Sequence, residues 1–379
     1  MRALVVLLIA CGVPTSAVGQ QEIVFSGRTW TSTVPDAKVE QYLGREALRL
    51  RSGSVFLDDV EFESGVIEYD MATTGHRSFV GAVFRRSETA PVGYEEFYLR
   101  PHQTGRFDAV QYTPSYNGIA AWQLYPEYNA PVNIPRNEWI HVKLVIAGSR
   151  MDVYVADMET PIMVVRHLRR GPGAGGVGLT SNFPGGQGSA IYPTAFANVT
   201  IRVDEGSVNW VEDTVPAATS GIIGAWALSP AVPATAGPVE TLDESIMAAS
   251  GWSVVRTDST GRLNIAAYAG FPQGARQGTV FARAIIHSDR AQAAKLNYGF
   301  SDRTSLFLNG QLVFTGNNTY RSRSLRYLGV MTLNNDAIYL NLREGENELV
   351  FAISEAFGGW GLVARLGDTD GVSIEARVP

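Results

Sequence analysis

One predicted strand carries an acid, a phenol and a cation on a single face. Side chains alternate along an extended segment, so Glu96, Tyr98 and Arg100 share one face while Phe97 and Leu99 point into a core. These polar groups can hold a hydroxyl-rich ligand, and general acid–base catalysis uses the same groups. Because Arg100 is expected on an open face, the sequence predicts that its loss costs well under ~1 kcal/mol of stability.

The polar face extends beyond the end of this strand. Pro101 ends the strand, and its restricted backbone directs His102 and Gln103. Antiparallel neighbours lie ~4.8 Å apart, so the next two predicted strands would bring their polar side chains beside this face. Arg100 and Gln103 are therefore predicted to bind ligand together with Asp108, Gln111, Trp122, Gln123 and Tyr125. Amides and guanidinium groups bind hydroxyls, and an aromatic ring covers the apolar face of a pyranose. The alternative is an ordinary solvated sheet face.

Two kinds of catalysis are compatible with these residues. His102 as base, Tyr98 as acid and Arg100 as charge neutraliser would suit a polysaccharide lyase. Glu96 and Asp108 would instead suit the carboxyl pair of a glycoside hydrolase. The catalytic candidates are thus Glu96, Tyr98 and His102, and the sequence leaves open whether the chain is an enzyme.

No metal or cofactor is predicted. No spacing of His, Cys and Asp matches a zinc site. Asp58, Asp59 and Asp302 are the acids that would serve a Ca²⁺ site. They lack the ladder of acids at alternate positions, so solvated turns are the favoured interpretation.

The N-terminus has the pattern of a bacterial export signal. Arg2 precedes an apolar run at 3–10, and the small residues at 17–19 predict cleavage before Gln20. The alternative is a lipoprotein in which Cys11, the only cysteine, is lipidated. We therefore expect a secreted or periplasmic protein with residues 1–19 as signal peptide.

Composition and pattern point to an all-β chain with two domains. The 379 residues are 45% hydrophobic and carry a net charge of −6, which disfavours nucleic acid as partner. Period-two alternation with frequent turns predicts antiparallel β-sandwiches of jelly-roll type, in tandem, at 20–202 and 222–379. The acidic and Pro/Ala-rich residues 203–221 are the expected linker, and each half is expected to fold alone. No later apolar run is long enough to span a membrane.

The first half resembles the concanavalin A-like lectin/glucanase superfamily, including laminin-G-like and 3-keto-disaccharide hydrolase-like domains. The resemblance rests on the strand patterns at 44–50, 62–70 and 137–155. It implies a sandwich with a concave sheet, and the superfamily includes lectins, glycosidases and lyases. Residues 68–73 lack the last acid of the glucanase pattern Glu-x-Asp-x-x-Glu. The Gln-x-His and Tyr-x-Lys-x-Gly-x-Tyr strings of alginate-lyase-like enzymes are absent.

The second half resembles a galactose-binding-like jelly roll, on residues 297–316 and 342–351. Asn309 and Gly310 predict a two-residue hairpin, since a type I′ turn needs two positive φ angles. Trp360 on its glycine-rich loop is expected in the core rather than exposed to a sugar.

These observations together predict an exported carbohydrate-binding protein. The concave sheet of the first domain would recognise an oligo- or polysaccharide, and the second domain would be an accessory module. The alternatives are a glycoside hydrolase or polysaccharide lyase that uses the same face, and a structural or adhesive surface protein.

Overall fold

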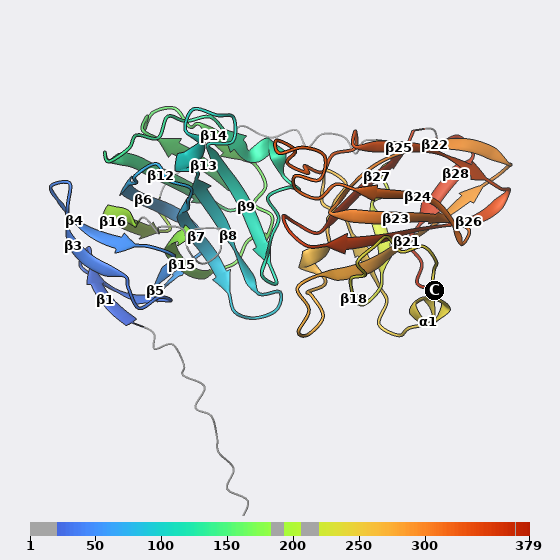
Figure 1. Cartoon of the computed structure of the whole chain (residues 1–379), viewed down its shortest axis with the longest axis horizontal. Helices are drawn as coiled ribbons and strands as arrows, with labels where there is room; N and C mark the ends of the chain where they lie inside the picture. The colour runs from blue at the N-terminus through green and yellow to red at the C-terminus, as the bar shows by residue number, and fades with distance from the viewer. Residues whose placement is uncertain (1–20, 183–192, 206–219, 368) are drawn as a thin grey trace, which may run out of the picture.

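The computed structural model describes residues 21–182, 193–205, 220–367 and 369–379, which form two β-sandwiches side by side (Figure 1). The predicted all-β class, with antiparallel sandwiches, is confirmed. The predicted signal peptide, its cleavage before Gln20, the alternative at Cys11 and most of the predicted linker lie outside the described residues. No helix within the described ranges is both long and apolar enough to cross a membrane.

The first sandwich packs a nine-stranded sheet against a seven-stranded sheet. The nine-stranded sheet runs in the order β1 (Gln21–Phe25), β2 (Arg28–Ser32), β5 (Gly53–Phe62), β15 (Gly175–Asn182), β7 (Phe79–Ser87), β8 (Gly93–Leu99), β9 (Val110–Tyr116) and β10 (Ile119–Ala120), with β11 (Asn129–Ala130) paired to β9. The seven-stranded sheet runs β14 (Met163–Val165), β13 (Arg150–Val155), β12 (Ile140–Ala147), β6 (Gly65–Ala72), β16 (Thr194–Val203), β4 (Arg45–Leu50) and β3 (Lys38–Tyr42).

Alternation along β8 separates a core face from a polar face, as the period-two pattern predicts. Phe97 and Leu99 are fully buried in the core between the two sheets. Glu95, on the same inward face, is a carboxyl inside the sandwich. It accepts hydrogen bonds from the Tyr112 hydroxyl (2.7 Å) and the Arg170 backbone N–H (2.8 Å), which is how a buried carboxyl is satisfied.

The second sandwich packs an eight-stranded sheet against a four-stranded sheet. The larger sheet runs β19 (Ser253–Arg256), β17 (Ala225–Leu228), β21 (Gly278–Ser288), β26 (Gly345–Glu355), β23 (Arg303–Leu308) and β24 (Gln311–Asn317), with β18 (Val232–Pro233) and β28 (Val372–Glu375) also paired to β21. The smaller sheet runs β20 (Arg262–Asn264), β27 (Gly361–Leu366), β22 (Gln292–Ser301) and β25 (Asp336–Leu342). One short helix, α1 (Glu244–Met247), is described outside the sheets, and short 3₁₀ turns are η1 (Pro101–Gln103), η2 (Pro126–Tyr128) and η3 (Ile265–Ala267).

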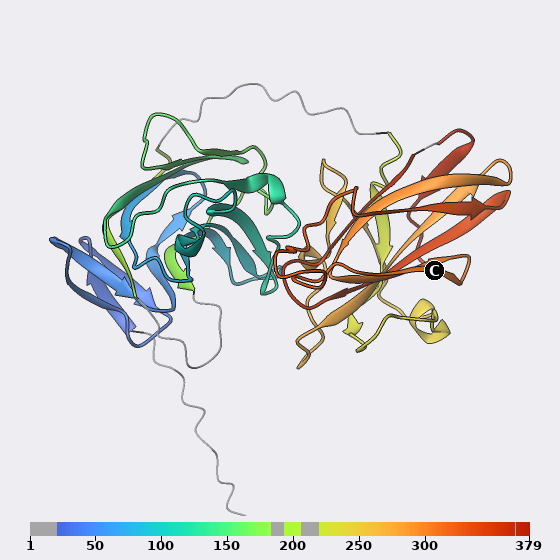
Figure 2. The ribbon, with the colours of Figure 1, turned by 45° about the horizontal axis from the view of Figure 1, so that its top comes forward.

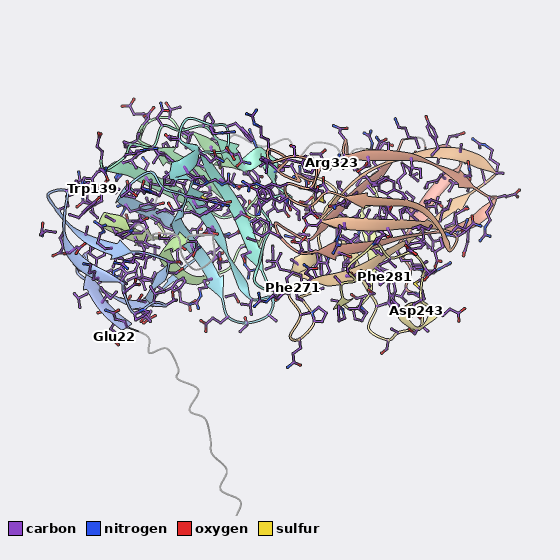
Figure 3. All side chains as sticks on the ribbon, in the orientation of Figure 1. Glu22, Trp139, Asp243, Phe271, Phe281 and Arg323 are labelled. Carbon is purple, nitrogen blue, oxygen red and sulfur yellow. The ribbon has the colours of Figure 1, made fainter. Side chains whose placement is uncertain are left out.

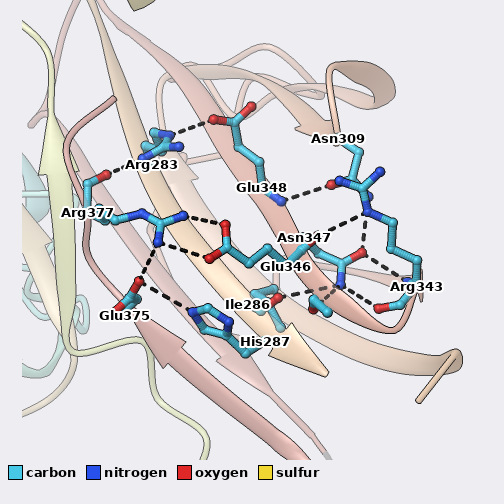
Figure 4. A network of polar contacts seen from close by, with 11 residues as sticks. Arg283, Ile286, His287, Asn309, Arg343, Glu346, Asn347, Glu348, Glu375 and Arg377 are labelled. Carbon is cyan, nitrogen blue, oxygen red and sulfur yellow. Dashed lines mark hydrogen bonds and ion pairs between the residues drawn. The ribbon is translucent and has the colours of Figure 1, made fainter. Parts of the chain in front are cut away.

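The predicted hairpin between β23 and β24 is present. Asn309 and Gly310 have φ angles of 52° and 79°, the two positive values that a type I′ turn needs. The Asn309 side chain also donates to Asn347, within a polar network that fastens one end of this sandwich (Figure 4). In that network Arg377, which follows β28, pairs with Glu346 at the start of β26. Trp360 is fully buried, as predicted.

The two sandwiches meet along the β9 side of the first, as two views show (Figures 1 and 2). Gln123 lies at the centre of the junction. Its side chain donates to the Leu328 carbonyl (2.7 Å) and accepts from the Ser301 hydroxyl (2.9 Å). A side chain at Gly329 or Gly358 would overlap Gln123, so these two positions need glycine for the sandwiches to close.

Apolar side chains also cross the junction. Met331 and Val363 from the second sandwich belong to the first core, while Tyr116 and Ile119 from the first belong to the second core. The sequence-based expectation of two separately folding halves does not include these shared contacts. Separating the halves would expose all four side chains to water, at a cost set by the apolar area uncovered.

Candidate functional site

A cavity of about 110 Å³ opens where the sandwiches meet. Its floor comes from the end of β8, from η1 and from β9, and its opposite wall comes from residues 320–330 and 357 of the second sandwich. That volume is room for several water molecules, since one needs roughly 10–15 Å³ of such space. We call this cavity the junction pocket.

The polar floor of the junction pocket is built around Arg100. Its guanidinium donates to the Asp108 backbone carbonyl (2.8 Å), the Tyr98 hydroxyl (3.0 Å) and the Gln111 side-chain oxygen. The Asp108 carboxylate lies 3.6 Å away, and Asn129 accepts a longer bond of 3.4 Å. Arg100 is only 7% exposed, so the prediction of an open-face arginine was wrong. Because this guanidinium already donates to acceptors of the protein itself, its role is to hold the side chains of the pocket floor in place.

Tyr98 is held by the same network. Its hydroxyl donates to Gln111 (2.8 Å) while accepting from Arg100. Burial is the main cause that raises the pKa of Tyr98 to about 12, so its hydroxyl stays protonated at neutral pH. Gln111 in turn donates to the Trp122 carbonyl (2.9 Å), which ties the floor to the aromatic wall described below.

Two buried polar atoms of the pocket residues have no partner among the described residues. They are Nδ1 of His102 and Oδ1 of Asp108. Burial, followed by the nearby charges of Arg77 and Arg100, lowers the pKa of His102 to about 4. The imidazole is therefore neutral at pH 7 and can both accept and donate a hydrogen bond. Unsatisfied buried polar atoms cost stability, which a ligand with hydroxyl groups would recover.

Aromatic rings form the opposite side of the pocket. Trp122 packs edge to face against Tyr320 (centroids 5.8 Å apart) and Phe357 (5.9 Å). Phe79 lies edge to face against both Tyr98 and His102. Phe107 also lines the pocket and is 60% exposed, so it adds accessible apolar surface there. The pocket therefore joins an apolar wall to a polar floor.

Two buried carboxyls hold the loop that brings Phe357 to the pocket. Asp302 accepts hydrogen bonds from the backbone N–H groups of Ala356 (3.0 Å) and Phe357 (2.9 Å), and Glu355 accepts one from Gly359 (3.0 Å). Burial raises the pKa of Asp302 to about 6, and burial together with the charge of Asp302 raises that of Glu355. One carboxyl of this close pair therefore keeps its proton more readily than an exposed acid would.

Most of the predicted site residues meet at this pocket. Those that line it are Tyr98, Arg100, His102, Gln103, Asp108, Gln111 and Trp122. Glu96 shares the polar face of β8 but is not among the lining residues, so the structure does not join Glu96 and Asp108 as a carboxyl pair in this pocket. Burial raises the pKa of the Glu96 carboxyl to about 7.

Two predicted ligand-binding residues have other surroundings. Gln123 is fully buried in the junction, where both ends of its amide bond to the second sandwich. Tyr125 is 2% exposed and packs in the first core, with the Arg169 guanidinium 4.7 Å from its ring centroid. Both lie outside the pocket lining, so the expectation that they face a ligand is corrected.

The sequence interpretation missed the residues that the second sandwich contributes. Four residues of the second sandwich line the pocket: Tyr320, Leu328, Val330 and Phe357. The first sandwich adds further residues that were not predicted: Arg77, Phe79, Phe107, Pro126 and Asn129. Phe357 belongs to the same glycine-rich loop as Trp360, so that loop was the available signal in the sequence. Nothing in strand periodicity shows which loops of one sandwich dock on another.

The three acids that would serve a Ca²⁺ site do not gather around a common centre. Asp58 and Asp59 are exposed on β5, where Arg28 pairs with Asp59 (2.8 Å). Asp302 is fully buried beside Phe357, so its interpretation as a solvated turn residue was wrong. Within the described ranges, no group of three or more His, Cys, Asp and Glu side chains could hold a metal.

Comparisons with known proteins find similar solved structures but no family. No family model matches the chain, and neither does any curated protein. The carbohydrate binding module CBM66 from Bacillus subtilis is 16% identical, with 45% of this chain and 94% of that one covered and a TM-score of 0.33. A Bacillus licheniformis beta-glucanase is 14% identical over 49% of this chain and 99% of that one, with a TM-score of 0.35. A family 35 carbohydrate binding module from an environmental isolate is 12% identical over 26% and 71%, with a TM-score of 0.18.

Proposed function

We propose that this chain binds a saccharide in the junction pocket. The observation that carries the proposal is the pairing of an aromatic wall with a polar floor that keeps two unpartnered atoms, on His102 and Asp108. A pyranose has an apolar face and a rim of hydroxyls, and it can satisfy both sides at once. In this proposal the second sandwich forms part of the site, where the sequence led us to expect an accessory module.

Trp122 is the residue whose loss tests the proposal most directly. It contacts both aromatic residues of the second sandwich. We expect Trp122→Ala to weaken saccharide binding about 10-fold or more, because stacking contributes roughly 0.5–1.5 kcal/mol beyond the area that it buries. Titration calorimetry with oligosaccharides selected on a glycan array measures the change.

Trp139→Ala is the matched control. Trp139 is a half-buried tryptophan next to the seven-stranded sheet, where it packs on Tyr42, and it does not line the pocket. If Trp139→Ala weakens binding and Trp122→Ala does not, the ligand binds elsewhere on the first sandwich. If no saccharide on the array binds the native protein, the proposal fails.

A lyase is the second candidate, favoured by the unpartnered and neutral His102. His102 would accept the proton next to the carboxyl carbon of a uronic acid residue as the C–O bond to the leaving sugar breaks and a C=C bond forms. Tyr98 would protonate the departing oxygen. Ultraviolet absorbance of the unsaturated product detects this reaction. Absorbance that develops with the native protein and not with His102→Gln, while the variant still binds, would establish it.

We also propose, from the sequence pattern alone, that the protein is exported and cleaved before Gln20. The intact mass of the mature protein tests this. A lipidated Cys11 would place the protein on a membrane surface instead.

A further inference from the structure

We infer that the saccharide bound in the junction pocket is anionic, carrying carboxylate or sulfate groups. This inference rests on the proposed function and adds a chemical class to it. Two independent observations support it. One is a cation at the edge of the pocket that pairs with no acid among the described residues, and the other is a basic loop of the second sandwich that begins and ends in the pocket wall.

The first observation is Arg77. It lines the pocket from the first sandwich, is exposed, and forms no ion pair or hydrogen bond with any described residue. Its charge contributes to the lowered pKa of His102, which places the guanidinium near the pocket floor. Protein acceptors engage the donors of Arg100, whereas no residue that the structure describes accepts a hydrogen bond from the Arg77 side chain. A guanidinium with free donors binds a carboxylate or sulfate in a bidentate manner.

The second observation is the loop at residues 321–327. Its neighbours Tyr320 and Leu328 both line the pocket, so both ends of the loop adjoin the pocket, and we call this loop together with Arg77 the pocket mouth. Arg321, Arg323 and Arg326 are exposed in this loop, and none of them forms an ion pair with a described residue. Figure 3 shows Arg323 on the second sandwich close to the junction.

Rings inside and beside the loop help to hold these cations in place. The Arg321 guanidinium lies 4.9 Å from the centroid of Tyr320, and that of Arg323 lies 4.9 Å from the centroid of Tyr327. Leu325, between the arginines, is 82% exposed. Cation–π contacts leave the outer donors of a guanidinium free for an anion.

Nearby acids do not cancel this charge. Asp108 is buried and faces Arg100 at 3.6 Å. Glu127 is paired with Arg262 at 2.5 Å. Asp336 is near enough to Arg323 for that charge to lower its pKa, although burial raises the pKa overall, and this single carboxyl can offset at most one of the three loop arginines. The mouth therefore carries an excess of positive charge in a protein whose net charge is −6. Such a local field attracts an anion and is weakened by salt.

The geometry of the wall and the mouth also suggests how such a ligand lies. One sugar ring would occupy the pocket, between the aromatic wall and the unpartnered atoms of the floor, with its anionic group at Arg77. Further acidic sugar units of the same oligosaccharide would pass over the 321–327 loop. A chain of repeated acidic sugars meets both groups of cations, whereas a neutral chain meets only the pocket.

Matched pairs of oligosaccharides test the inference on the full chain. The probes are trimers of glucuronic, galacturonic and mannuronic acid, the neutral trimers of glucose, galactose and mannose, and a sulfated galactose trimer. We expect an acidic trimer to bind at least about 10-fold more tightly than its neutral counterpart. That preference should shrink as ionic strength rises from about 0.05 to 0.5 M. The uronic and sulfated arms separate carboxylate from sulfate recognition.

Charge-removing variants locate the preference. Arg77→Gln should weaken binding of the acidic trimer about 10-fold more than it weakens binding of the neutral trimer. The triple change of Arg321, Arg323 and Arg326 to Gln should weaken longer acidic oligomers more than the trimer. Arg51→Gln is the control, because Arg51 is an exposed arginine of the first sandwich that is not among the pocket residues.

The outcomes separate the two proposals. Neutral trimers that bind as tightly as the acidic ones would overturn the anionic inference and leave saccharide binding intact. Absence of binding to every saccharide would overturn the proposed function itself. Tighter binding of a single-stranded DNA oligonucleotide than of any acidic trimer would also overturn the inference, since charge alone would then explain the affinity.

Discussion

Replacing Arg100 by alanine should destabilise the first sandwich strongly. The guanidinium is 7% exposed, and it is the donor to the Asp108 carbonyl and to the side chains of Tyr98 and Gln111. It is also the cation that faces the buried Asp108 carboxylate, at 3.6 Å. Alanine would leave that carboxylate buried without the countercharge that now faces it, and the Asp108 carbonyl without this donor.

The size of the effect follows from these lost partners. Removing one member of a buried ion pair costs about 3–5 kcal/mol, because the charge that remains stays desolvated. Tyr98 and Gln111 still bond to each other, which keeps part of the network. We therefore expect a loss near the lower end, about 3 kcal/mol. The sequence alone predicted well under ~1 kcal/mol, on the assumption of an open face.

Urea denaturation followed by tryptophan fluorescence measures this difference. Arg77→Ala is the control: Arg77 is exposed and makes no polar contact with described residues, so its loss should change stability by less than ~0.5 kcal/mol. If the free energy of unfolding of Arg100→Ala lies within ~1 kcal/mol of the native value, the floor of the pocket is not organised as described.

Three further predictions concern the junction, pH and metal. Gln123→Ala removes two hydrogen bonds between the sandwiches, one buried and one part-buried, and should lower the unfolding free energy by about 2–4 kcal/mol. We expect the native protein to melt in one calorimetric transition and the variant in two. A single transition in both would contradict the shared junction. Folding raises the pKa of Glu96 from 4.5 to about 7, so Glu96 favours the folded state below pH 4.5 and this contribution is lost as pH rises toward 7. Folding lowers the pKa of His102 from 6.5 to about 4, so His102 favours the folded state above pH 6.5 and this contribution is lost as pH falls toward 4. The stability of Glu96→Gln, relative to the native protein, should accordingly rise as pH increases from 4.5 to 7. The stability of His102→Gln, relative to the native protein, should rise as pH decreases from 6.5 to 4. Urea titrations of the native protein and both variants at several pH values check both signs. A calcium chelator should leave the melting temperature unchanged, and a drop of several degrees would reveal a calcium site.

The sequence predicts the pocket floor better than its walls. Tyr98, Arg100, Gln111 and their neighbours lie on adjacent strands joined by a short connection, so alternation and strand order bring them together. The side chains of Tyr320 and Phe357 reach the same pocket only through the docking of two sandwiches, which strand periodicity does not encode.

Some polar side chains turn inward for reasons that a pattern cannot show. Glu95 alternates correctly with Glu96, yet it is the inward carboxyl, and it is stabilised by Tyr112 and by the Arg170 backbone from a loop far along the chain. Gln123 likewise resembles a ligand-binding amide in sequence and instead bonds the sandwiches together. Both cases depend on partners that lie distant in the chain.

The division of the pocket between two sandwiches has a consequence for how the protein is made. Ribosomes synthesise the N-terminal part first, so the first sandwich can form before residues 320–363 exist. During that interval Trp122 has neither of its aromatic neighbours, and the sites that Met331 and Val363 fill are open to water. A nascent or prematurely ended chain would thus present an adhesive apolar edge to chaperones and proteases. Only chains synthesised beyond Phe357 contain the complete pocket, so only these would be retained on an immobilised saccharide.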